Sequence, residues 1–252
     1  MGTFELPAFK SSLEWTRFDE EVHQAELEGF SVEFVTSERN IFVIMEVLGD
    51  KWGKACAKKA MDRALHGGSI VTLTDLILRA QDAAGQFGQL IPAIACYRTG
   101  FTYDFRGPTP PHPPLVVEIG WIENWHQALN KVSLYFTPTF VAPDGSMVEE
   151  VWTLFLARAA PTVPALTAPA YTQTQPFDEL EGILNQNSGT GVDAEEPTII
   201  VFHHRHGIYP PSYGVLNWNT SLAAPAGSHF TGRLDSNTIL RMAYQGATQL
   251  LE

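Results

Sequence analysis

The chain has 252 residues, of which 44% are hydrophobic and 17% are charged, and its formal net charge at pH 7 is −12. This composition excludes wholesale disorder, because it carries enough apolar surface to build a substantial core. The acidic balance argues against nonspecific binding of nucleic acid through the overall charge, since the summed field repels phosphate. We expect one globular domain with extensions, of the α/β class or alternatively α+β.

The chain has two cysteines, Cys56 and Cys96, and both lie in apolar contexts without a CxxC pattern. Neither a disulfide framework nor a zinc ribbon is therefore expected. The N-terminal residues lack a basic start followed by an apolar core, so they do not predict a signal peptide. The longest apolar runs are too short to span a bilayer. We expect an intracellular protein, cytoplasmic or nuclear, that is not secreted and has no membrane partner.

The first predicted strands follow an N-terminal extension, residues 1–30. Residues 32–47 alternate between apolar and polar side chains and then become continuously apolar, which predicts two short strands around a turn at residues 37–40. The domain core is expected to begin at residue 31 and to run to residue 157.

Residues 51–65 predict a helix that is strongly basic within an acidic protein. Lys51, Lys54 and Lys58 fall on one stripe of this helix, where they could contact nucleic-acid phosphates. The alternative is an ordinary solvated helix face, with Lys58 and Asp62 as an i,i+4 pair.

A second helix is predicted over residues 75–84, with Leu76, Ile77 and Ala80 on its apolar face. Residues 90–105 then predict a strand, a turn at residues 98–100 and another strand.

The central region predicts a strand, a helix and a strand. Five prolines within residues 107–114 form a stiff connection, and the uniformly apolar run 115–119 predicts a central strand. Residues 121–136 show the clearest helical period of the chain, and residues 148–157 predict the next strand. Such a unit implies a right-handed crossover and a locally parallel sheet.

The C-terminal part begins with residues 158–197, which are poor in large apolar groups and rich in turn formers. We interpret this segment as an extension or insertion. Residues 198–202 predict one more strand and residues 237–251 a helix, so that residues 198–252 complete the domain.

Three residues of the central region could converge on one point. Asp104 lies near the end of a predicted strand, Glu118 near the end of the next, and Lys131 on the helix that follows. Two carboxylates on adjacent strands can hold a divalent cation, with the backbone carbonyl of Ile119 as a further oxygen ligand. A bound cation lowers the pKa of a water, and a lysine can orient that water or stabilise developing charge. A lone strand-end glutamate or helix lysine is more often a surface group, so the hypothesis depends on all three residues.

This region resembles the PD-(D/E)xK nuclease superfamily and, within it, the Uma2-like endonuclease branch. There, an aspartate on one strand precedes a Pro-Pro-x-hydrophobic-hydrophobic-Glu-hydrophobic strand, and the lysine can migrate onto the following helix. The match covers about residues 100–157, through Pro113 to Ile119 (PPLVVEI), Lys131 with Tyr135, and a strand that contains Trp152. The resemblance implies a restriction-endonuclease-like core, in which a central mixed sheet is flanked by helices. It also implies hydrolysis of DNA by Mg²⁺ or Mn²⁺ held by Asp104 and Glu118.

Two positions depart from the family's pattern. Tyr103 stands where the motif has a proline, and Gly120 stands where the undrifted motif has its lysine. For the acidic residue that often joins such sites from the N-terminal side, the candidates are Glu46, Asp50 and Asp62. The alternative function is therefore a catalytically inactive copy of this architecture, which serves as a binding or assembly module for a protein partner or as a homodimer.

A cluster of three histidines, His203, His204 and His206, forms a third candidate site. On a strand His204 and His206 share one face, so a two-histidine metal site is a further hypothesis. No acidic or thiol ligand lies beside them at a familiar spacing, which favours a structural or exposed role. His112, within the proline run, is expected at the surface or in support of other groups.

Overall fold

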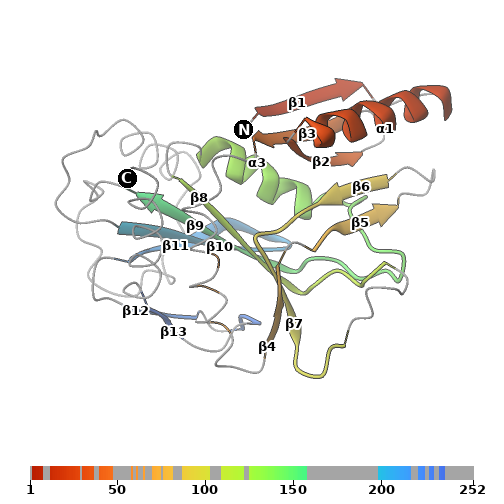
Figure 1. Cartoon of the computed structure of the whole chain (residues 1–252). Helices are drawn as coiled ribbons and strands as arrows, with labels where there is room; N and C mark the ends of the chain where they lie inside the picture. Colours follow the sequence, from red (N-terminus) through yellow and green to blue (C-terminus); the bar gives the residue numbers. More distant parts are fainter. Residues whose placement is uncertain are drawn as a thin grey trace.

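The computed structural model describes two large sheets, a short third one and two complete helices (Figure 1). The described residues are 2–7, 12–28, 30–36, 40–47, 58, 61, 65, 70–74, 76–81, 87–102, 109–121, 125–157, 198–216, 221–224, 227–229 and 233–235. In this part of the chain, no helix is long and apolar enough to cross a membrane.

The N-terminal sheet has five antiparallel strands in the order β1-β3-β2-β6-β5. Its strands are β1 (Gly2–Pro7), β2 (Phe30–Thr36), β3 (Asn40–Val47), β5 (Leu78–Gln81) and β6 (Phe87–Leu90). Helix α1 (Ser12–Leu27) packs on this sheet, where the ring of Phe18 meets that of Phe34 edge to face at 5.1 Å. The segment expected as an N-terminal extension thus supplies β1 and α1.

The second sheet has six strands in the order β11-β10-β9-β8-β7-β4. Its strands are β4 (Ile70–Leu73), β7 (Ile94–Arg98), β8 (Leu115–Trp121), β9 (Glu150–Ala157), β10 (Thr198–Arg205) and β11 (Ile208–Leu216). Strands β8 and β9 are parallel, and α3 (Trp125–Tyr135) connects them. The other neighbours in this sheet are antiparallel. Strands β12 (Ser221–Ala223) and β13 (Arg233–Asp235) form the third sheet.

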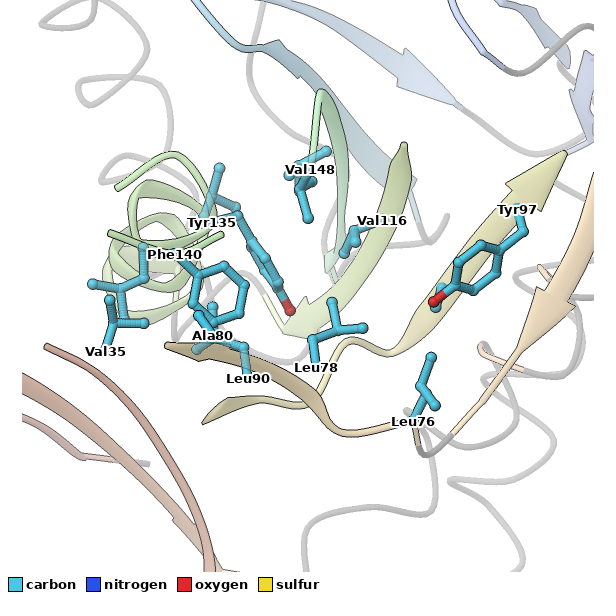
Figure 2. Close-up of a cluster of buried hydrophobic side chains, with 14 residues drawn as sticks. Val35, Leu76, Leu78, Ala80, Leu90, Tyr97, Val116, Tyr135, Phe140 and Val148 are labelled. Carbon is cyan, nitrogen blue, oxygen red and sulfur yellow. The ribbon is translucent and has the colours of Figure 1, made fainter. Parts of the chain in front are cut away.

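Two apolar cores cover the two faces of the six-stranded sheet. On one face, side chains from the strands, such as Val117 and Ile119, pack with the helical residues Met61 and Leu65. On the other face, α3 lies between the two large sheets, as Figure 1 shows. Figure 2 shows Tyr135 of α3 within this second core, where its ring meets Phe140 edge to face at 6.0 Å.

The structure confirms the expected fold class, since strands and helices form open sheets of the α+β kind around a central mixed sheet. It also confirms the strand pair in residues 32–47, the central strand β8 and the parallel crossover through α3. The strand predicted at residues 198–202 is β10.

The predicted helix at residues 75–84 is wrong, because residues 78–81 form strand β5 and pair with β6. Leu76, Leu78 and Ala80 are buried, whereas Ile77 and Arg79 are exposed, so burial alternates with a period of two. The predicted helix placed Ile77 on its apolar face, but Ile77 is exposed in the segment that leads into β5.

The turn at residues 98–100 is confirmed by the bond from Phe101 N to Arg98 O at 3.2 Å, and Gly100 has a φ of 91°. Phe101 and Thr102 do not continue as a strand. Residues 103–105, Lys51, Lys54, the segment 158–197 and the C-terminal helix predicted at 237–251 lie outside the described residues.

Candidate functional site

Glu118 and Lys131 meet beneath helix α3, as the sequence predicts. Along β8, Val117 and Ile119 face the first core, so Glu118 between them faces α3. The Lys131 Nζ atom lies 3.1 Å from Glu118 Oε1, and both residues are 6% exposed. Two of the three predicted catalytic residues are therefore in contact. Asp104 lies outside the described residues.

Gly120, which departs from the family's pattern, lies on the same face of β8 as Glu118. Residue 120 faces α3 as Glu118 does, and a Cβ atom there would lie 3.8 Å from the Cβ of Ala128 and 3.9 Å from the Phe155 ring. A Cβ itself fits, but a lysine would have to pass between the packed helix and sheet. The amine that contacts the Glu118 carboxylate belongs to Lys131 of α3.

Tyr135 is the second α3 residue in this site. It follows Lys131 by four residues, which places both side chains on one helix face. Its hydroxyl donates to Glu118 Oε1 at 2.5 Å, and in Figure 2 the oxygen points toward β8. Burial and the nearby Glu118 charge raise the pKa of Tyr135 well above its ordinary value, so the phenol stays protonated. Tyr135 therefore fixes the orientation of Glu118.

Glu33 of β2 completes the site from the N-terminal sheet. Its Oε1 accepts from Lys131 Nζ at 2.9 Å, and its Oε2 accepts from the backbone N of Ile91 at 2.7 Å. Lys131 also donates to Ile91 O at 2.7 Å. We call Glu33, Glu118, Lys131 and Tyr135 the buried ionic cluster.

The sequence analysis missed Glu33 and named Glu46, Asp50 and Asp62 instead. The side chains of these three residues are not described. A signal was present, because Glu33 stands among the apolar residues Val32, Phe34 and Val35 in a strand. All four are buried, so β2 has no solvent face there for an acid.

The cluster holds two carboxyl groups against one ammonium group, and this imbalance governs its ionisation. Burial, helped by the Glu118 charge and opposed by Lys131, raises the pKa of Glu33 from 4.5 to about 7. Burial alone would lower the pKa of Lys131, but the Glu118 and Glu33 charges raise it above its ordinary value. Lys131 is thus a permanent cation at neutral pH, while Glu33 titrates.

The divalent cation expected at this cluster stays a prediction, and oxygen atoms are its candidate ligands. Among the described residues, Lys131 and Tyr135 both contact Glu118 through its Oε1. Thr153 pairs with Glu118 in register across β8 and β9, and its buried Oγ1 has no hydrogen-bond partner in the described structure. Oxygen atoms of this kind are the ligands that Mg²⁺ prefers. The described residues hold no group of three His, Cys, Asp or Glu that could bind a metal, but Asp104 is not among them.

A second buried carboxylate, Glu150, anchors a hydrogen-bond network that the sequence analysis also missed. Its Oε1 accepts from Trp152 Nε1 at 2.6 Å, from His203 Nε2 at 2.8 Å and from the Ser228 hydroxyl. Its Oε2 accepts from the backbone N of His229 at 2.7 Å. Burial favours the neutral acid, but hydrogen bonds from His203, Ser228 and His229 lower the pKa of Glu150 to about 2. We call these five residues the Glu150 network.

The predicted pair of metal-binding histidines has no common environment. His204 is largely buried and stacks on Phe202, and burial lowers its pKa to about 3. His206 is exposed in the turn after β10, and its ring lies 5.9 Å from that of Phe136. His203 belongs to the Glu150 network, which gives it a structural role.

His112 is buried, which corrects the expectation of a surface position. Its Nε2 lies 3.0 Å from Arg79 O, and its ring stacks on Phe140. The position follows from the proline run, which packs inward beside β7 through the bond from Tyr97 Oη to Pro111 O at 2.8 Å.

The structure also describes two further residues that the sequence analysis proposed for the site. Lys58 is helical and half-buried, and it is the only described member of the predicted basic stripe. Ile119 lies within β8 with its side chain in the first core, and the proposed role of its carbonyl stays a prediction. No protein-family model matches the chain, and no curated protein matches its sequence.

Proposed function

We propose that this protein hydrolyses phosphodiester bonds in DNA with Mg²⁺ or Mn²⁺, through a site formed by Asp104, Glu118 and Lys131. The observation that supports this proposal is the approach of Lys131 Nζ to Glu118 Oε1, at 3.1 Å, within the β8–α3–β9 unit. The resemblance to PD-(D/E)xK nucleases calls for this pairing when the lysine lies on the helix. The hydroxyl of Tyr135 supports this pairing, because it donates a hydrogen bond to the same carboxylate oxygen.

Each residue then has a chemical role. Glu118 Oε2 and Asp104 would hold the cation, with the carbonyl of Ile119 as a further ligand. A bound divalent cation lowers the pKa of its water and polarises a phosphate oxygen. Lys131 is protonated at neutral pH, so it would stabilise the charge that develops on phosphate rather than act as a base.

Contacts with DNA would come from outside the cluster, because the chain is acidic overall. Lys51, Lys54 and Lys58 form the one strongly basic stretch of the sequence and would contact phosphates. An intracellular location, cytoplasmic or nuclear, belongs to this proposal. The proposal also requires that DNA reaches the buried ionic cluster.

Cleavage of plasmid DNA tests the proposal. Wild-type protein with Mg²⁺ or Mn²⁺ should cut, and chelation with EDTA should stop it. Glu118→Gln keeps the shape of the side chain but removes the charge that holds the cation, so cleavage should fall at least about 100-fold. Glu149→Gln, at a half-exposed carboxylate outside the cluster, is the matched control. Equal cleavage by wild type and Glu118→Gln would contradict the assignment.

A second function is favoured by the complete set of hydrogen-bond and ion-pair partners around the Lys131 ammonium. Its three hydrogens are directed to Glu33, Glu118 and Ile91 O, and the two carboxylates and the ammonium are each less than 10% exposed. Such a closed cluster would brace the two sheets in a catalytically inactive binding or assembly module, for a protein partner or a second copy of the chain. Calorimetry with Mg²⁺ and Mn²⁺ separates the two functions, because the module needs no cation.

A further inference from the structure

A cavity of about 490 Å³ lies at the end of the six-stranded sheet where β8 and β9 begin and β7 ends. Its walls come from the turn after β7, the proline run before β8 and the loop before β9. None of the four residues of the buried ionic cluster lines it. Small-molecule sites in proteins measure about 300 to 1,000 Å³, so this cavity has the size of such a site.

Ring stacking and hydrogen bonds hold these walls together without a ligand. The ring of Phe101 stacks on that of Tyr97 at a centroid distance of 3.8 Å, and Tyr97 Oη donates to Pro111 O at 2.8 Å. The backbone N of His112 donates to Ser146 Oγ at 2.7 Å, which joins the proline run to the loop before β9. A cavity whose walls are already fixed loses little conformational entropy when it binds a ligand.

Part of the lining is apolar and reachable from solvent. Phe101, Pro111 and Pro114 are half-buried, and Met147 is 38% exposed. Met147 is one of four large apolar side chains that are exposed in the described part of the chain. An apolar ligand body would remove this surface from water, and the rings of Phe101 and the two prolines favour a flat one.

Arg98 supplies the charge that can take a partner from a ligand. It is exposed at the end of β7, and no carboxylate among the described residues forms an ion pair with it. The acid of the lining, Glu149, already accepts from His229 Nε2 at 2.8 Å. Arginine binds a carboxylate through two parallel hydrogen bonds, so a carboxylate is the ligand group that suits this position.

We propose that this cavity binds a small molecule with a flat apolar body and one carboxylate, and that Arg98 pairs with the carboxylate. The apolar body would contact Phe101, the two prolines and Met147. This inference does not depend on the proposed hydrolysis of DNA, because the cavity shares no residue with the ionic cluster and needs no cation.

The test is calorimetric titration of the full chain with naphthoate in EDTA, beside naphthamide, which has the same shape without the charge. Wild type should bind naphthoate at least about tenfold more tightly than naphthamide. Arg98→Gln should remove this difference and leave the affinity for naphthamide unchanged. Met147→Ser should weaken both ligands by a similar factor, because it removes apolar contact alone. Arg17→Gln, at an exposed arginine of α1, is the matched control and should change neither affinity.

Each outcome decides the proposal. A wild type that does not bind naphthoate overturns it, and so do equal affinities of the wild type for naphthoate and naphthamide. Equal loss of naphthoate binding in Arg17→Gln and Arg98→Gln would mean attraction by surface charge alone and also overturns it. If Arg98→Gln melts below the wild type, its affinity for naphthamide decides: an unchanged value supports the role of Arg98, and a lost one overturns it.

Discussion

Two buried carboxylate sites in this protein differ in what surrounds them. The Glu150 network gives its carboxylate four donors, from Trp152, His203, Ser228 and His229, and its pKa falls to about 2. The buried ionic cluster gives two carboxyl groups one shared ammonium, and the pKa of Glu33 rises to about 7. Burial alone raises the pKa of a carboxyl group, so the donors around it decide the outcome.

The comparison separates a carboxylate with a full set of donors from the candidate site. Glu150 is satisfied and permanently charged, and it ties residues 228–229 to β9 and β10. The ionic cluster has more acid than base, and the pKa of its Glu33 lies near neutral pH. Perturbed ionisation of this kind is common at functional sites.

The largest expected effect is on Glu150. Glu150→Ala leaves the four donors buried without an acceptor, so it should lower the free energy of unfolding by about 3 to 5 kcal/mol. Urea denaturation at pH 7 measures this. The neighbouring Glu149→Ala is the control, since its half-exposed pair with His229 should cost no more than about 1 kcal/mol. Similar losses in both variants would remove the structural distinction between the two sites.

Loss of Lys131 should be nearly as severe. Lys131→Met leaves Glu33 and Glu118 facing each other without a cation, and we expect a loss of about 3 kcal/mol at pH 8. The double variant Lys131→Met/Glu33→Gln removes one of the two charges and should recover part of this loss. If the double variant is less stable than the wild type by the sum of the two single effects, the two residues do not interact.

The pH dependence of stability should run in opposite directions at the two sites. The raised pKa of Glu33 stabilises the fold fully below pH 4.5, and this contribution is lost as the pH rises through about 7. The lowered pKa of Glu150 stabilises the fold above pH 4.5, and this contribution is lost as the pH falls toward 2.

Urea denaturation from pH 5 to pH 8 can isolate the Glu33 contribution. Wild type should lose stability over this range relative to Glu33→Gln, at roughly 1.4 kcal/mol for each unit of pKa shift. Parallel curves for the two proteins would show that Glu33 does not titrate in this window.

The smallest effect is expected for Tyr135→Phe. This change removes one hydrogen bond to Glu118 Oε1 and keeps the ring that packs against Phe140, so it should cost about 1 to 2 kcal/mol. Denaturation at pH 7 checks it. An unchanged stability would mean that the hydroxyl does not hold Glu118.

The sequence predicted the part of the site that depends on local pattern. The apolar run of β8 and the helical period of α3 set the crossover, and the crossover brings Glu118 and Lys131 together. Glu33 could not be found in this way, because its role depends on the packing of a second sheet against α3. Residues 76–81 show the limit of periodicity, because a short apolar segment fits both a helix and a strand.

The most direct test of the account is the position of a bound cation in crystals soaked with Mn²⁺. We expect an anomalous peak within bonding distance of the Glu118 carboxylate and no peak in Glu118→Gln crystals. A peak elsewhere, for example at His204 and His206 or in the Glu150 network, would contradict the assignment of the ionic cluster as the reactive site. So would the absence of any peak at a Mn²⁺ concentration that supports DNA cleavage.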